Sequence, residues 1–248
     1  MKKSVCLVGG FMVNANYGDV IQAKVWIDWY RNNGYSFKFI SYREGKNTCI
    51  NELGLNNDEI ITNNEFLKSN FYKRGYKNLH LYGGGYLNKF WCKDFVELIK
   101  KANSIGMNVL ATGVQVDEFY MQKAKGIQVK YLSVRDELSK KIVDESKSLV
   151  LDDSLLYFKF KLKFYDIIRQ FFYFCNSGVL LQLSLNSYVY RKENENEIKI
   201  TYRSIIEKLR KRYHLTMISS FPLETVEILE GKNLVNYLQV DDNNIRYS

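Results

Sequence analysis

The chain has 248 residues, of which 46% are hydrophobic and 25% are charged, and it contains a single proline. An apolar fraction of this size excludes a disordered or collagen-like protein and is enough to bury a substantial core. The net charge of +9 favours anionic partners, a class that includes phosphorylated metabolites, nucleic acid and anionic membrane surfaces.

The first apolar stretch, Val5–Val13, follows Met1-Lys2-Lys3 and superficially resembles a secretion signal. Because Gly9-Gly10 interrupts it, we interpret it as a buried strand that enters a glycine-rich turn. A second stretch, Phe171–Leu185, is shorter than the ~20 residues that a membrane-spanning helix needs. The four cysteines form no C-x-x-C pair, so we expect structural thiols in a cytoplasmic protein.

Short β-branched runs alternate with longer amphipathic segments through the first half of the chain. Strands are predicted at Val5–Gly9, Ser36–Tyr42, Leu79–Tyr82, Val109–Thr112, Tyr131–Val134 and Leu149–Leu151. Helices are predicted at Asp19–Arg31, Phe90–Ala102 and Glu137–Val143. Strands separated by helices form βαβ units, so the pattern predicts a parallel sheet covered by helices.

The second half is predicted to repeat this theme with about three strands. Asn176-Ser177-Gly178 is the best boundary signal, so we expect domains at residues 1–175 and 176–248. The predicted elements are strands at Val179–Leu185, Leu215–Ser219 and Leu234–Val240, a helix at Ile200–Tyr213 and a short helix opened by Pro222. The predicted fold class is therefore α/β, with two Rossmann-like parallel-sheet domains of which the second is abbreviated.

The first candidate binding element is the turn Asn14-Ala15-Asn16-Tyr17-Gly18-Asp19, between the first predicted strand and helix. In an open parallel sheet, ligands bind where strands end and where helix N-termini offer backbone N–H groups. Gly18 lets a ligand approach the backbone, and Asp19 can cap the helix. An ordinary turn with a helix cap explains the same residues, and the missing G-x-G-x-x-G spacing argues against a dinucleotide.

The second candidate is Gly83-Gly84-Gly85, directly after the predicted strand that contains His80. Three consecutive glycines lose much conformational entropy on folding, so a structured loop that holds them has a steric reason. That reason is either close approach of a ligand or tight packing under a neighbouring loop. Inside its strand, His80 is interpreted as a buried histidine with hydrogen-bond partners rather than as a ligand-binding one.

The third candidate is Arg135, at the tip of the strand in Ser133-Val134-Arg135-Asp136. Its guanidinium can bind a carboxylate or a phosphate through two parallel hydrogen bonds, or it can pair with a nearby acid for structural reasons. An anion site is predicted where the strands before Gly10, Gly83 and Arg135 end. This requires Arg135 to lie within ~10 Å of a glycine loop.

Two further features have ordinary explanations. Asp152-Asp153-Ser154 follows another strand and can hold an acceptor hydroxyl or act as a base, although paired acids there are also common helix caps. The basic run Lys208–Arg212 has no aromatic platform, so it is interpreted as a solvated helix face and no nucleic-acid partner is expected. His214 is expected at a solvated helix end.

Five motifs occur in a set order along the chain, and together they resemble the polysaccharide pyruvyl transferases. The resemblance covers residues 1–160 well and the rest loosely. The motifs are Asn16-x-Gly18-Asp19, Gly83-Gly84-Gly85-x-Leu87, Ala111-Thr112-Gly113-Val114, Ser133-Val134-Arg135-Asp136-x-x-Ser139 and Asp152-Asp153-Ser154-Leu155.

Members of that family have a two-domain fold like the GT-B glycosyltransferases. They move the enolpyruvyl group of phosphoenolpyruvate onto a sugar of a surface polysaccharide precursor, leaving a pyruvate ketal. The resemblance implies that Arg135 holds the carboxylate or phosphate and that Asp19 or Asp153 engages sugar hydroxyls. The implied substrate-binding residues are Asn16, Gly18, Gly83, Gly84, Gly85, Thr112 and Ser133.

Phosphoenolpyruvate is then the donor substrate, a glycan or lipid-linked sugar is the acceptor, and no cofactor or metal is expected. The pyruvyl transfer is expected at the cytosolic face of the membrane, and peripheral contact of the protein with anionic lipid stays open. The sequence differs from the family at Asp152-Asp153-Ser154, where the family has Asp-Pro-Ala. It also lacks the late Arg-x-His-Gly-like motif, which implies a shortened second domain and leaves the general acid unassigned.

Two other functions stay open at this point. One is a GT-B-like glycosyltransferase that uses a nucleotide sugar. The other is a catalytically inactive family member that acts as a binding partner.

Overall fold

The computed structural model describes residues 3–10, 17–88, 92–143, 148–150, 153, 179–181, 195–217, 232, 235–236, 238–241 and 245–247. The chain divides into two compact units, Met1–Lys161 and Leu162–Ser248. The domain boundary predicted between residues 175 and 176 lies outside the described residues.

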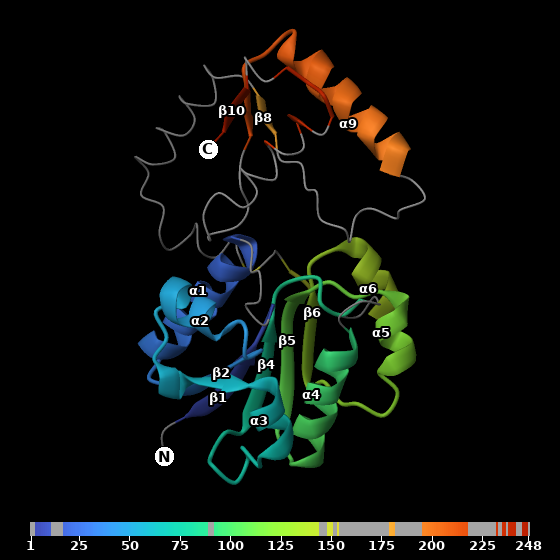
Figure 1. The fold of residues 1–248 in the computed structure, drawn as a ribbon. Coiled ribbons are helices and arrows are strands. Elements are labelled where there is room, and N and C mark those ends of the chain that lie inside the picture. Colours follow the sequence, from blue (N-terminus) through green and yellow to red (C-terminus); the bar gives the residue numbers. More distant parts are fainter. Residues whose placement is uncertain are drawn as a thin grey trace. The chain divides into compact units, whose positions relative to one another are not determined.

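The first unit is built on a seven-stranded sheet in which all neighbouring strands are parallel (Figure 1). Its strand order is β3-β2-β1-β4-β5-β6-β7. The strands are β1 (Ser4–Val8), β2 (Ser36–Ser41), β3 (Ile60–Thr62), β4 (Asn78–Tyr82), β5 (Asn108–Val114), β6 (Tyr131–Val134) and β7 (Ser148–Leu149). The parallel sheet predicted for this half is thereby confirmed.

Helices cover both faces of this sheet and bury a separate apolar cluster on each. The clusters alternate along β1: Val5 and Leu7 belong to one, and Cys6 and Val8 belong to the other. Helices α1 and α2 contribute to the first cluster, and α3, α4 and α5 contribute to the second. The helical elements are α1 (Tyr17–Asn32), α2 (Lys46–Leu53), η1 (Asn57–Glu59), α3 (Asn63–Lys68), α4 (Cys92–Ser104), α5 (Glu118–Lys123) and α6 (Glu137–Val143).

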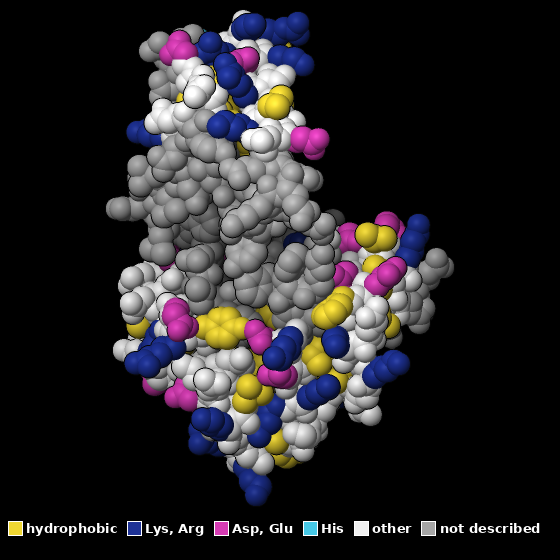
Figure 2. Space-filling view, turned by 45° about the vertical axis from the view of Figure 1, so that its right-hand side comes forward, with side chains coloured by type: hydrophobic (Ala, Val, Ile, Leu, Met, Phe, Trp, Pro, Cys, Tyr) yellow, Lys and Arg dark blue, Asp and Glu magenta, His cyan; other side chains and the backbone are white. Residues whose placement is uncertain are grey.

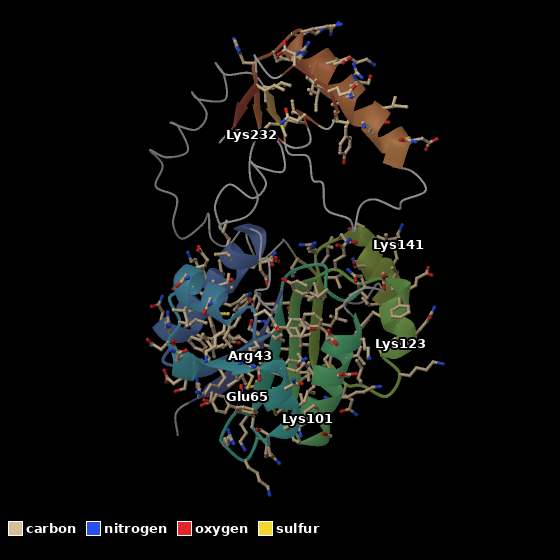
Figure 3. The ribbon with its side chains drawn as sticks, in the orientation of Figure 1. Arg43, Glu65, Lys101, Lys123, Lys141 and Lys232 are labelled. Atoms are coloured by element: carbon tan, nitrogen blue, oxygen red, sulfur yellow. The ribbon has the colours of Figure 1, made fainter. Side chains whose placement is uncertain are left out.

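Some of the lysines of the first unit lie at the C-terminal ends of helices. Lys101, Lys123 and Lys141 lie in the last turns of α4, α5 and α6, on the helices that flank the sheet (Figure 3). Cations there interact favourably with the partial negative charge of the helix C-terminus. Among the described residues, no helix is both long enough and apolar enough to cross a membrane.

The second unit contains a three-stranded parallel sheet, in the order β10-β9-β8, with one long helix. Its core includes Ile206, Leu215, Met217 and Ile245. The elements are β8 (Val179–Leu181), α9 (Glu195–Arg210), β9 (Leu215–Met217) and β10 (Ile245–Tyr247). The short helix predicted at Pro222 lies outside the described residues.

The strand predicted at Leu234–Val240 is wrong. Val235 and Asn236 are helical, and the chain turns at Leu238 and Gln239, where Gln239 has a φ of 55°. Val235, Leu238 and Val240 are buried, so the apolar pattern was a core signal. Its i, i+3 spacing from 235 to 238 belongs to a helical turn rather than to a strand.

Several short elements of the first unit were not predicted, namely α2, η1, β3, α3 and α5. One of them had a readable signal. Thr62 and Glu65 form a capping box at the start of α3, with the Thr62 hydroxyl accepting from the Glu65 N–H at 3.1 Å. The sequence Thr-x-x-Glu is the usual signature of this cap.

Candidate functional site

The strand order of the first unit reverses at β1. The chain runs from β1 to β2 and β3 on one side, and then returns to the other side of β1 with β4. In open parallel sheets, ligands bind beyond the carboxyl ends of the strands at such a point. We call this region the switch-point edge. Its described residues are Gly9, Gly10, Gly18, Asp19, Gly83–Tyr86, Thr112–Gln115, Arg135 and Asp153.

The triple glycine lies at this edge, and packing accounts for two of its three members. Gly83 and Gly84 have positive φ angles, 50° and 77°, which favour glycine. A Cβ on Gly83 would overlap the Gln22 side chain, and a Cβ on Gly84 would overlap the Tyr86 ring. The Gly83 N–H donates to the Thr112 carbonyl at 2.7 Å, so this amide is already committed to the protein.

The side chains beside Gly85 are Gln115 and Arg135, and a Cβ on Gly85 would lie 3.1 Å from Gln115 Oε1. The Arg135 Nη2 atom lies 3.8 Å from the position that a Cβ on Gly85 would occupy. The same nitrogen donates to Gln115 Oε1 at 3.2 Å. The structure therefore places Arg135 well within ~10 Å of a glycine loop, as the shared anion site requires.

Asp136, the acid next to Arg135 in the sequence, is bound to the start of α6. The Asp136 carboxylate accepts from the Ser139 N–H at 2.7 Å and from the Ser139 hydroxyl at 2.8 Å. This is the geometry of a helix cap. The Ser139 hydroxyl also accepts from the Val116 N–H at 2.9 Å, so it ties the start of α6 to the segment that follows β5.

The turn after β1 meets the triple-glycine loop through Asp19. The Tyr86 hydroxyl donates to Asp19 Oδ1 at 3.1 Å, and a Cβ on Gly10 would lie 3.2 Å from the Asp19 carboxyl carbon. Asp19 is half-buried in the first turn of α1, where Gly18 is exposed. Asn16, also predicted to bind substrate, lies outside the described residues.

Thr112, Ser133 and Asp153 have protein partners at this edge. Asp153 is 4% exposed, and its Oδ2 accepts from the Trp26 indole at 2.8 Å and from the Thr112 hydroxyl at 3.0 Å. The Ser133 hydroxyl, also buried, accepts from the Gly113 N–H at 3.2 Å. These contacts hold the three side chains in place, and their roles toward a ligand stay predictions.

His80 is buried under this edge with two partners. The Tyr30 hydroxyl lies 3.1 Å from Nδ1, and the Thr112 hydroxyl lies 2.9 Å from Nε2. Burial lowers the pKa of His80 to about 3, because charging the ring away from water is unfavourable. The interpretation of His80 as a buried histidine with hydrogen-bond partners is confirmed.

The buried cysteines also suit a structural role. Cys6 and Cys49 are unpaired thiols, and burial raises the pKa of Cys49 to about 11 and that of Cys6 still further. A thiol that stays protonated at neutral pH is a weak nucleophile. Among the described residues, no group of three or more His, Cys, Asp or Glu side chains could hold a metal ion.

Four residues that contribute to the site were not predicted from the sequence: Trp26, Tyr30, Tyr86 and Gln115. Trp26 and Tyr30 were recognised only as part of a helix, and the rotation of that helix against the sheet decides which ring reaches Asp153. Tyr86 follows the triple glycine directly. An aromatic residue at this position could have indicated that a glycine is needed to leave room for its ring. No signal in the sequence marked Gln115.

Comparison with known proteins gives structural neighbours only. No family model matches the chain, and no curated protein matches it. The UDP-GlcNAc 2-epimerase of Methanocaldococcus jannaschii aligns with 100% of this chain and 73% of its own, at 16% identity and a TM-score of 0.56.

Two bacterial structures align over 100% of this chain and 69% of theirs. One is the S. aureus MnaA–UDP co-structure, at 7% identity and a TM-score of 0.57. The other is a putative UDP-N-acetylglucosamine 2-epimerase from Listeria monocytogenes, at 9% identity and a TM-score of 0.56. At such identities the likeness shows the fold, and it confirms the GT-B-like α/β class predicted from the sequence.

Proposed function

We propose that the chain is a cytoplasmic transferase that moves the enolpyruvyl group of phosphoenolpyruvate onto a sugar of a glycan precursor. The observation that supports this most is the Arg135 guanidinium beside Gly85 at the switch-point edge. Phosphoenolpyruvate carries a carboxylate and a phosphate on three carbons, so its site needs dense positive potential in little space. A planar guanidinium next to a glycine provides both.

In this proposal two sugar hydroxyl oxygens bond to C2 of phosphoenolpyruvate, and the bond from C2 to the phosphate oxygen breaks. The two hydroxyl groups lose one proton each. The methylene carbon takes up one proton and becomes a methyl group, and the other proton leaves with the inorganic phosphate. Arg135 holds the anionic donor, and Asp19 or Asp153 engages the hydroxyls. Each correctly placed acid or base contributes about 10²–10⁴-fold to the rate.

A second candidate is an enzyme that acts on a nucleotide sugar. It is favoured by the structural neighbours, which include UDP-GlcNAc 2-epimerases. Calorimetric titration of the purified protein with phosphoenolpyruvate and, separately, with UDP-GlcNAc distinguishes the two. Heat of binding with phosphoenolpyruvate alone supports pyruvyl transfer, and heat with UDP-GlcNAc alone favours the second candidate. Binding of phosphoenolpyruvate without release of phosphate in the presence of acceptor glycans supports an inactive binding partner.

Replacing Arg135 by lysine is expected to weaken phosphoenolpyruvate binding about 10- to 150-fold while leaving the melting temperature unchanged. Lysine keeps the charge but loses the fork that matches a carboxylate or phosphate, a loss of about 1.5–3 kcal/mol. Titration calorimetry and a melting curve of each variant measure the two effects. Arg43→Lys is the matched control, since Arg43 is exposed and lies after β2 (Figure 3). Unchanged affinity with a lowered melting temperature would assign Arg135 a structural role.

We further propose that the exposed face of α9 makes the peripheral contact with anionic lipid. Lys208 is exposed on α9, Lys211 and Arg212 are exposed in the turn that follows it, and Ile200 and Ile205 are 68% and 38% exposed. Figure 2 shows several Lys and Arg side chains on the second unit, with some acidic and apolar side chains among them. Exposed isoleucines among cations suit a lipid surface, where each Lys or Arg contributes about 1 kcal/mol.

The double variant Lys208→Glu, Arg212→Glu is expected to bind vesicles with 30% anionic lipid at least tenfold more weakly than the unaltered protein, since two attractive charges become repulsive. Co-sedimentation with vesicles measures this, and neutral vesicles should retain neither protein. Lys125→Glu, an exposed position of the first unit, is the matched control. Equal binding to neutral and anionic vesicles would rule the contact out.

A further inference from the structure

A line of hydrogen bonds runs through the first unit toward the switch-point edge. It connects Tyr30 on α1, His80 on β4, Thr112 on β5 and Asp153 after β7, with separations of 3.1, 2.9 and 3.0 Å. Tyr30, His80 and Asp153 are 5%, 1% and 4% exposed. Trp26 joins at the end of the line, where its indole donates to the same Asp153 oxygen at 2.8 Å.

The direction of each bond follows if Asp153 is ionised, as a base must be. An ionised carboxylate only accepts, so the single hydroxyl proton of Thr112 then points at Asp153. Thr112 can then only accept from His80, which places the imidazole proton on Nε2. A neutral imidazole has one N–H, so Nδ1 accepts, and it accepts from the Tyr30 hydroxyl. Every donor in the line therefore points toward Asp153.

We infer that His80 and Thr112 are positioning residues that hold Asp153 as an oriented carboxylate at the switch-point edge. The inference rests on the proposed function, because it gives Asp153 the role of the base that takes the proton of an attacking sugar hydroxyl. In that step the O–H bond of the hydroxyl breaks and its oxygen bonds to C2 of phosphoenolpyruvate, while the C2=C3 double bond opens and C3 takes up a proton to become a methyl group. The hydroxyl proton passes to the Asp153 carboxyl. Hydrogen bonds that polarise one another strengthen the hold on a carboxylate away from water.

The tautomer of His80 tests the line directly. The chain has only two histidines. In protein labelled with ¹⁵N-histidine, the variant His214→Gln therefore identifies the His80 signals. We expect a neutral His80 with its proton on Nε2 at pH 7. Thr112→Val removes the acceptor and should move the proton toward Nδ1, whereas Thr112→Ser should leave it on Nε2. A proton on Nδ1 in the unaltered protein, or the same tautomer in the Val and Ser variants, would overturn the inference.

The pH dependence of turnover tests the positioning role. Thr112→Val removes one donor from the Asp153 carboxylate, so the acidic limb of kcat/KM for phosphoenolpyruvate should move up by about one pH unit. Thr112→Ser should leave it in place. A purely structural role would lower the melting temperature of the Val variant without moving this limb, and that result would overturn positioning. Absence of turnover in all three proteins would refute the proposed function. The tautomer of His80 would still test the line of hydrogen bonds, because that measurement does not need turnover.

Discussion

Replacing Gly84 by alanine is expected to destabilise the first unit by roughly 2–4 kcal/mol. About 1 kcal/mol comes from placing a Cβ at a φ of 77°, and roughly 1–3 kcal/mol comes from overpacking against the Tyr86 ring. That ring has little room to move, because it stacks on Phe95 at 5.1 Å and its hydroxyl is bound to Asp19. Chemical denaturation followed by circular dichroism measures the loss.

Gly126→Ala is the matched control for Gly84→Ala. Gly126 has almost the same φ, 78°, but a Cβ there meets nothing within 4 Å. It should therefore lose only the ~1 kcal/mol of backbone strain. The difference between the two variants isolates the packing of Tyr86. Equal losses would contradict a packing reason for Gly84 and would return the triple glycine to the ligand-binding interpretation.

Acidification from pH 7 to pH 5 is expected to lower the free energy of unfolding by about 2 kcal/mol through His80 alone. The pKa of His80 is about 3 in the folded protein and 6.5 in the unfolded chain, so between these values the unfolded chain binds more protons. Stability therefore rises with pH across this window and falls as the solution is acidified. Urea titrations at half-unit pH steps measure the slope.

One variant assigns this pH dependence. His80→Gln should flatten the slope between pH 7 and pH 5, because it removes the buried ring. Glu65 does not confuse the result: hydrogen bonds from Thr62 lower its pKa, so its contribution is lost only at more acidic pH. The same slope in the unaltered protein and in His80→Gln would show that the ring is not held neutral by burial.

The sequence was most informative where local pattern and topology agree. Strand β6 and helix α6 have the bounds that were predicted, because a short apolar strand ends just before Arg135 and the following acids suit a first helical turn. The placement of Arg135 beside a glycine loop followed from the rule that parallel strands present their carboxyl ends at one edge. Short elements such as β3 were missed because three residues are too few to show a period.

The partners of the site residues could not be predicted, because they depend on how distant elements pack. Trp26 and Asp153 are 127 positions apart, and only the rotation of α1 on the sheet brings them within 2.8 Å. The triple glycine shows the same limit. Its sequence indicated a steric cause but not whether a ligand or a side chain lies beside the glycines. In the structure the Gln22 and Tyr86 side chains lie there.

The position of β1 inside the sheet, between β2 and β4, has a consequence for how the protein is made. Ser4 pairs with Ser36 on β2, whereas Val5 pairs with Asn78 on β4, much farther along the chain. Closing the longer loop costs more entropy, so we expect the seam between β1 and β4 to join after β1 has met β2. The glycine turns on either side of that seam come together only then. A growing chain is therefore expected to assemble the proposed anion site late, and affinity for phosphoenolpyruvate would then report that both halves of the sheet have joined.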